Sequence, residues 1–139
     1  MKVMGLDYGK ARIGVALSDI MGFLASPFTT LKRTELTKDI NFLKDIILKN
    51  DVKTVVIGLP LEMSGNKGVI AKETEEFADV LKNETGVNIE FVDERLSSYE
   101  AEEQLKLTIK SWEKRKQLLD QVSASIILQN YLDRNKEKL

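Results

Sequence analysis

The sequence predicts an α/β fold in which a mixed sheet is flanked by helices. Short extended segments separated by turn signals fill the first part of the chain, and helical segments alternate with apolar, β-branched segments in the rest. A strand meander followed by such an alternation builds a mixed sheet with helices on its faces. Because 139 residues is the usual size of one domain, we expect a single domain over residues 1–139.

The chain is expected to open with an antiparallel meander of three strands. Residues 2–8 and 12–18 are short apolar segments split by residues 9–11, which is the pattern of two strands joined by a tight turn. A third extended segment is expected from residue 23 to about residue 32. Pro27 within it favours an edge position, because proline cannot donate a hydrogen bond to a neighbouring strand.

Helices and parallel strands are expected to alternate after the meander. Two sets of residues recur at helical spacing: Leu36, Ile40, Leu43 and Ile47, then Ile70, Thr74, Phe77, Ala78 and Leu81. Each predicted helix leads to a buried strand, over residues 52–59 and 87–92, and Gly86 is expected to end the second helix. Residues 60–68 read as a loop. Residues 118–132 predict a last amphipathic helix, and further helix is expected between residues 99 and 107.

The residue types that the chain lacks narrow its chemistry. The sequence contains no cysteine and no histidine, which excludes thiol nucleophiles, thiolate zinc sites and histidine-dependent triads. Any bound metal is therefore expected to be a hard cation, and carboxylates are its candidate ligands. The net charge of −1 lacks the basic excess that is typical of tight nucleic-acid binders, which counts against a nuclease.

The chain carries no sequence signal for a membrane or for export. Its apolar runs are far shorter than the roughly 20 residues that a spanning helix needs. An acid and two glycines stand where a signal peptide would have its apolar stretch. We therefore expect a cytoplasmic protein with no membrane span.

Acids stand at three places where a charge is costly. Asp7 lies in an otherwise apolar strand, although an acid that caps the following turn explains it equally well. Asp93 and Glu94 end the last predicted strand, where a local ion pair would also explain them. Asp120 continues the buried stripe of the last helix, so it either pairs internally, with Arg95 as a candidate, or faces a site against the sheet.

The positions of these acids converge on one edge of the predicted sheet. Ligand sites in open α/β sheets gather beyond the carboxyl ends of strands, which is where the acids of the two strands lie. A shared cation explains the costly charges more simply than separate causes do. We therefore expect two Mg²⁺ or Mn²⁺ ions, bridged by Asp7 and held also by Glu94 and Asp120, that activate water and stabilise the leaving oxygen of a phosphodiester.

Four groups of motifs along nearly the whole chain are shared with a known family. They are Gly5-Leu6-Asp7-Tyr8-Gly9 with Arg12-Ile13-Gly14-Val15-Ala16, Val56-Ile57-Gly58-Leu59-Pro60-Leu61 with Gly65, Val92-Asp93-Glu94-Arg95-Leu96-Ser97-Ser98, and Asp120-Gln121-Val122-Ser123-Ala124 through Ile127-Leu128-Gln129. Together they resemble the YqgF family, described as Holliday junction resolvases and as nucleases for pre-16S ribosomal RNA. The resemblance implies an RNase H-like fold and catalytic roles for Asp7, Glu94 and Asp120. It also favours Glu94 over Asp93, because a glutamate ends the corresponding strand in related resolvases.

Basic residues are expected to contact the nucleic acid. They are Lys10, Arg12, Arg95, Lys110, Lys114 and Arg115, the last three from a basic stretch over residues 106–116. A solvated helix face explains any single lysine equally well. The glycines of loop residues 64–68 would also allow a close approach to phosphates.

The resemblance favours processing of the 5′ end of pre-16S rRNA in ribosome biogenesis. Resolution of Holliday junctions in DNA recombination and repair is the alternative, and a non-catalytic nucleic-acid-binding module is the second alternative. An actin-like ATPase or sugar kinase is a further rival, but its cleft needs two lobes, which 139 residues cannot supply. The motifs distinguish neither RNA from branched DNA nor a monomer from a homodimer.

Overall fold

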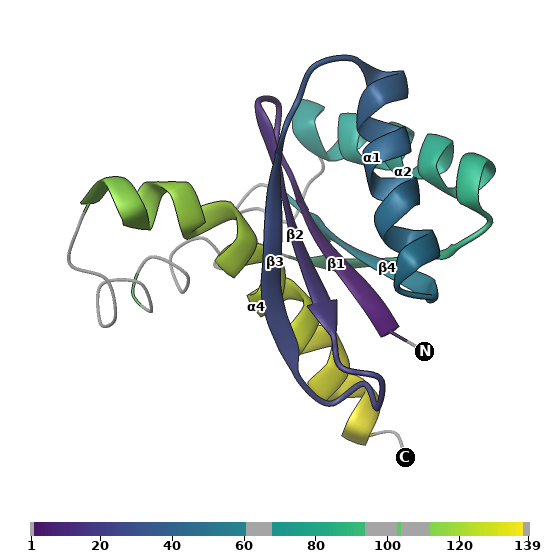
Figure 1. Ribbon diagram of the computed structural model, residues 1–139, viewed down its shortest axis with the longest axis vertical. Coiled ribbons are helices and arrows are strands. Elements are labelled where there is room, and N and C mark those ends of the chain that lie inside the picture. Colours follow the sequence, from purple (N-terminus) through teal and green to yellow (C-terminus); the bar gives the residue numbers. More distant parts are fainter. Residues whose placement is uncertain (1, 61–67, 94–102, 104–111, 138–139) are drawn as a thin grey trace.

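The structure is a computed structural model that describes residues 2–60, 68–93, 103 and 112–137. Its elements are β1 (Lys2–Tyr8), β2 (Arg12–Ser18), β3 (Ala25–Lys32), α1 (Leu36–Lys49), β4 (Val52–Leu59), α2 (Val69–Thr85), β5 (Asn88–Asp93) and α4 (Trp112–Glu137). The strands form one mixed sheet in the order β3-β2-β1-β4-β5. Helices α1 and α2 cover one face and α4 crosses the other (Figure 1). The predicted mixed sheet with flanking helices is confirmed.

The predicted antiparallel meander is present with its expected turns. Strands β1 and β2 have the predicted bounds and pair antiparallel, and β3 pairs antiparallel with β2 at the edge of the sheet. Strand β3 begins at Ala25, two residues later than predicted, because the preceding turn is closed by Asp19. The Asp19 Oδ1 atom accepts hydrogen bonds from the backbone N–H groups of Phe23 and Leu24 at 2.8 and 2.9 Å.

Strands β4 and β5 run parallel to β1, so their carboxyl ends meet at one edge. The register pairs Leu6 with Ile57, and Gly58 with Val92. The two predicted helices between the strands are confirmed as α1 and α2, and α2 ends at Gly86, whose φ of 76° is the left-handed conformation that glycine adopts readily. Helix α4 extends beyond the predicted 118–132 at both ends. The helix predicted between residues 99 and 107 falls outside the described residues except for Glu103.

Alternating side chains of the sheet form two apolar clusters. Residues that point toward α1 and α2 include Met4, Leu6, Ile13, Val15, Val55 and Ile57, which pack with Leu43, Phe77 and Leu81. Residues on the α4 face include Ala16, Val56 and Val92, which pack with Ala124, Ile127 and Leu128. The period of two along each strand therefore assigns each strand residue to one of two layers.

Helix α4 lies directly against the backbone of β1 and β2. A Cβ atom at Gly14 would collide with the backbone carbonyl group of Asp120, and it would lie 3.0 Å from the backbone nitrogen of Gln121. A Cβ at Gly5 would lie 2.7 Å from the Cβ of Leu128 and 2.9 Å from the carbonyl oxygen of Ala124. Glycine is therefore required at both positions for the helix to approach this closely.

A buried ion pair on the opposite face ties the meander to the helices. Asp39 on α1 is 1% exposed, and its carboxylate accepts hydrogen bonds from Arg33 Nε and from the backbone N–H of Thr34, both at 3.2 Å. Arg33 Nη1 donates to Tyr8 Oη at 2.7 Å, and the guanidinium carbon lies 4.7 Å from the centre of the Tyr8 ring. Burial alone would lower the pKa of Arg33, but the hydrogen bonds to Tyr8 and Asp39 raise it. Sequence reasoning missed this cluster.

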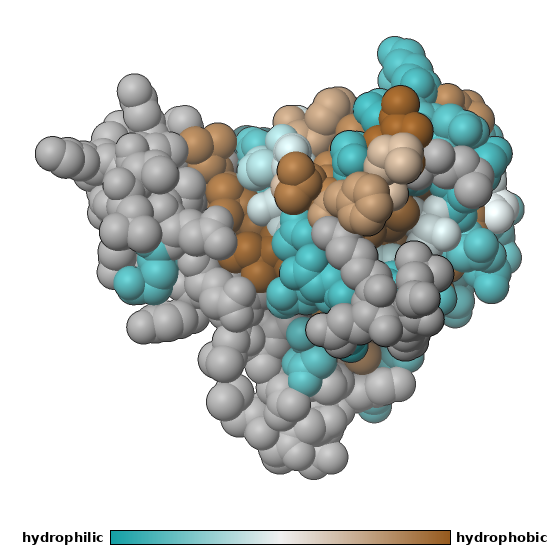
Figure 2. Space-filling view, turned by 90° about the horizontal axis from the view of Figure 1, so that it is seen from below, coloured by the Kyte–Doolittle hydropathy of each residue, from teal (hydrophilic) through white to brown (hydrophobic). Residues whose placement is uncertain are grey.

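The described surface mixes apolar and polar side chains, as Figure 2 shows for one face of the molecule. The most exposed large apolar side chains include Ile20, Met21 and Leu24, in the connection between β2 and β3. Over the part of the chain that the structure describes, no helix is both long enough and apolar enough to span a bilayer.

We expect Asp39→Ala to lower the free energy of unfolding by about 3–5 kcal/mol, because it leaves the Arg33 guanidinium partly buried without its carboxylate partner. Asp45→Ala is the matched control on the same helix. The side chain of Asp45 is 62% exposed and pairs with Lys49, so its loss should cost less than about 1 kcal/mol. Urea denaturation of both variants measures the difference, and equal losses would contradict the structural role of Asp39.

Candidate active site

Asp7 lies at the carboxyl edge of the central strands. It is the last but one residue of β1, and it is partly buried. Its position is one residue beyond the Leu6–Ile57 pair, so β4 presents Gly58 beside it. Side-chain alternation places Asp7 on the same face as Gly5, which is the face that α4 covers. The candidate site therefore lies on the α4 side of the sheet.

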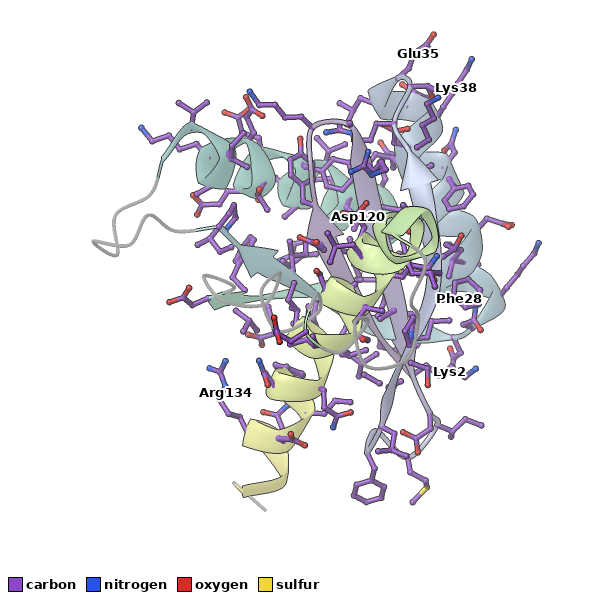
Figure 3. All side chains as sticks on the ribbon, turned by 90° about the vertical axis from the view of Figure 1, so that its left-hand side faces the viewer. Lys2, Phe28, Glu35, Lys38, Asp120 and Arg134 are labelled. Atoms are coloured by element: carbon purple, nitrogen blue, oxygen red, sulfur yellow. The ribbon has the colours of Figure 1, made fainter. Side chains whose placement is uncertain are left out.

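The packing of α4 brings Asp120 to the strand position opposite Asp7. Gly14 is the antiparallel partner of Asp7, and paired Cα atoms in such a ladder are about 5 Å apart. The backbone of Asp120 rests on this same Gly14. Figure 3 shows Asp120 in the first half of α4, where the helix crosses the strands. The structure thus brings two of the three predicted acids together on one face.

Arg12 pairs directly with Asp120. The Arg12 Nε atom donates a hydrogen bond to Asp120 Oδ2 at 2.6 Å, and the side chains of Arg12 and Asp120 are 49% and 20% exposed. This hydrogen bond raises the pKa of Arg12, and the negative charge of Asp120 raises it further. Arg12 is the first residue of β2 and so lies two positions before Gly14. The ion pair therefore places a fixed positive charge at the solvent side of Asp120.

The third predicted acid, Glu94, lies outside the described residues. Its neighbour Asp93 ends β5, where it pairs in register with Leu59 of β4. Val92 belongs to the apolar cluster on the α4 face, so alternation directs Asp93 to the opposite face of the sheet. Among the residues that the structure describes, no three acids gather into a group that could hold a metal ion.

The predicted nucleic-acid contacts are described only in part. Lys10 is exposed in the turn between β1 and β2, and Arg12 follows it at the start of β2. Arg95 and Lys110 lie outside the described residues, as do the side chains of Lys114 and Arg115. An ion pair of Asp120 with Arg95, which the sequence suggested, stays a prediction, and the structure shows Arg12 as a partner of Asp120. The first hairpin thus carries the two predicted contact residues whose side chains the structure describes, Lys10 in its turn and Arg12 at the start of β2.

The chain is similar over most of its length to known proteins. Residues 1–134 match the model of a family described as "RuvX: Holliday junction resolvase". A relative from Syntrophomonas wolfei is 44% identical over 96% of this chain and 94% of the relative. A relative from Clostridioides difficile is 46% identical over 95% of this chain and 94% of the relative. Both relatives carry the name "Putative pre-16S rRNA nuclease".

Solved structures show the same fold at low sequence identity. Thermus thermophilus RuvC in complex with a Holliday junction has a TM-score of 0.65 and 13% identity, over 99% of this chain and 96% of RuvC. The fowlpox virus resolvase in complex with Holliday junction DNA has a TM-score of 0.59 and 10% identity, over 97% of this chain and 99% of the resolvase. At this identity the likeness concerns the fold alone, and it confirms the RNase H-like architecture.

We expect Gly14→Ala to displace Asp120 from the sheet, because the added methyl group collides with the helix backbone there. Gly5→Ala is the matched comparison, since its methyl group meets α4 one turn further along, at Ala124 and Leu128. Both variants should lose about 1–3 kcal/mol of stability in urea unfolding. Only Gly14→Ala should shift the NMR signal of the Arg12 Nε–H group strongly, and equal shifts in both variants would contradict local displacement.

Proposed function

Because the chain belongs to the RuvX family of Holliday junction resolvases, which the sequence motifs identified as the YqgF family, we propose that it is a cytoplasmic nuclease that uses divalent cations. The chain is a nuclease by family, and residues 1–139 would form its single catalytic domain. The main support for the metal dependence is that Asp7 and Asp120 both lie next to Gly14, Asp7 as its strand partner and Asp120 through its backbone.

The chemistry of these side chains fits a hard divalent cation. Asp7 and Asp120 offer carboxylate oxygens, the donors that Mg²⁺ and Mn²⁺ prefer. The Asp120 carboxylate holds a cationic group in the structure, the Arg12 guanidinium. The chain has no histidine to act as a general base, so a carboxylate-bound metal is the simplest means of activating water.

Glu94 is the proposed third ligand. Alternation along β5 turns Asp93 away from the α4 face, whereas Val92 lies on that face. Because Asp93 faces away from α4, Glu94 is the remaining candidate of these two neighbouring acids. This supports the choice that the family resemblance suggested.

The proposed roles of the acidic and basic residues follow from their charges and positions. Two cations held by Asp7, Glu94 and Asp120 would supply an activated water and stabilise the leaving oxygen of the phosphodiester. Arg12 uses Nε on Asp120, which leaves its terminal N–H groups to donate to a phosphate oxygen. Lys10 is exposed in the turn just before Arg12 and adds a second positive charge that can contact the phosphate backbone of the nucleic acid.

We propose structured RNA as the substrate, in the maturation of the 5′ end of pre-16S rRNA. The support is the name of the relatives, which match nearly the whole chain at 44% and 46% identity. The family description favours a Holliday junction as the second candidate substrate. The two substrates share a phosphodiester backbone, so the same acids would serve either reaction.

We expect Asp7→Asn and Asp120→Asn to reduce cleavage to the level seen in EDTA, because each removes a carboxylate charge from the proposed cation site. The assay compares a labelled pre-16S rRNA leader with a synthetic four-way DNA junction, each with Mg²⁺ or Mn²⁺. Asp45→Asn on the exposed face of α1 is the matched control and should cleave normally.

Cleavage of one substrate that is lost in both site variants would support the proposal and identify the substrate. Full activity of Asp120→Asn, or cleavage that persists in EDTA, would reject the metal site. Binding of RNA without any cleavage by the wild-type protein would instead favour a non-catalytic binding module.

We expect Arg12→Gln to weaken binding of a labelled RNA stem-loop and to reduce the slope of log affinity against log salt by about 0.7–0.9, the value for one phosphate contact. Arg134→Gln is the matched control. Arg134 is exposed near the other end of α4 (Figure 3), roughly 21 Å along the helix from Asp120. Equal salt slopes for wild type and Arg12→Gln would contradict a phosphate contact by Arg12.

A further inference from the structure

Ser123 is a buried polar residue of α4 that the proposed chemistry does not use. Its side chain is 1% exposed, and no hydrogen-bond partner reaches its Oγ atom within the described structure. The nearby Ser125 is satisfied, because its Oγ donates to the carbonyl oxygen of Val122 at 2.7 Å. A buried hydroxyl without a partner is costly, so a ligand is one of the few explanations for keeping it.

The direction of α4 determines which part of the sheet Ser123 approaches. Asp120 rests on Gly14, whose partner on β1 is Asp7, whereas Leu128 rests on Gly5. The helix therefore runs antiparallel to β1. Since β4 and β5 are parallel to β1, a step backward along α4 is a step toward the carboxyl ends of all three strands.

Ile127 is a reference point for the position of Ser123 along α4. It lies four residues after Ser123 on the same side of the helix and packs in the cluster that includes Val56 of β4 and Val92 of β5. Four helical residues rise about 6 Å, which is close to the rise of about 6.6 Å for two strand residues. Ser123 is therefore about one helical turn nearer than Ile127 to the carboxyl ends of these strands.

The neighbourhood of Asp120 relates Ser123 to the proposed cation site. Gly58 carries no side chain, and it lies between the strand of Asp7 and the strand that leads to Glu94. Ser123 also follows Asp120 by three residues, the spacing that puts two side chains next to each other on a helix. A hydroxyl that no described atom satisfies is thus placed next to Asp120, one of the proposed ligands.

We propose that Ser123 Oγ is an additional oxygen donor to the divalent cation held by Asp7, Glu94 and Asp120. The proposal rests on the metal-dependent function above and adds a ligand to it. Serine and threonine hydroxyls bind Mg²⁺ in other enzymes that act on phosphates. Coordination gives the buried oxygen of Ser123 the partner that the described protein atoms do not provide.

The first test is Mn²⁺ binding by calorimetry in the absence of nucleic acid. Ser123→Ala should bind Mn²⁺ roughly 10-fold more weakly than wild type. Ser125→Ala, an equally small change on the same helix, should bind it normally. In EDTA, Ser123→Ala should unfold at the same or a higher urea concentration than wild type, because it removes an unsatisfied hydroxyl.

The second test changes the chemistry of the donor atom. The chain has no cysteine, so Ser123→Cys introduces a unique thiol of similar size. A thiolate prefers soft ions, so this variant should bind Mn²⁺ more weakly and Cd²⁺ more tightly than wild type. Ser125→Cys should show neither change.

The outcomes separate the two levels of the proposal. The role of Ser123 would be overturned if Ser123→Ala bound Mn²⁺ as tightly as the wild-type protein and Ser123→Cys showed no higher affinity for Cd²⁺. The metal site itself would then remain supported. Failure of the wild-type protein to bind Mn²⁺ at all would overturn both the metal-dependent function and this ligand.

Discussion

The close contact between α4 and the glycines of the first hairpin is the constraint on which the candidate site depends. Without side chains at Gly5 and Gly14, the helix backbone reaches the sheet backbone. The contact at Gly14 sets the height of Asp120, and strand pairing places Asp7 opposite the same glycine. An acid near the start of the chain and one in the last helix thereby meet without a loop to guide either of them. The geometry belongs to rigid elements, which hold functional groups more reproducibly than loops do.

The two faces of the sheet act on the same hairpin in different ways. On the α1 and α2 face, Arg33 donates to the Tyr8 hydroxyl and to the Gly9 carbonyl oxygen, and Asp39 holds Arg33 in turn. These contacts fix the chain directly after Asp7. On the α4 face, Arg12 from the other arm of the hairpin pairs with Asp120. The contacts that stabilise the turn therefore lie on one face of the sheet, and the acids proposed for catalysis lie on the other face.

Asp39 and Asp120 show that an acid on a buried helical stripe is not by itself evidence of a site. Both continue the apolar spacing of their helices, and the spacing of α1 would have identified Asp39 in advance. Asp39 is 1% exposed and is enclosed by its partners, which suits a structural charge. Asp120 is more open, and its partner Arg12 is half exposed, so a cation or a phosphate can reach the pair. The exposure of each acid and of its partner, rather than its place on an apolar stripe, separates the two roles.

The sequence by itself determined the elements of the fold and the acids worth testing. Strands β1, β2 and β4 have their predicted bounds, because apolar alternation, β-branching and turn residues act over a few neighbouring positions. The family motifs then nominated Asp7, Glu94 and Asp120. Only the tertiary structure decided that Arg12 pairs with Asp120, that Asp93 turns away from α4 and that Ser123 is buried with no hydrogen-bond partner among the described residues. These facts depend on how a helix is seated on a sheet, which is a relation between distant segments that no local pattern encodes.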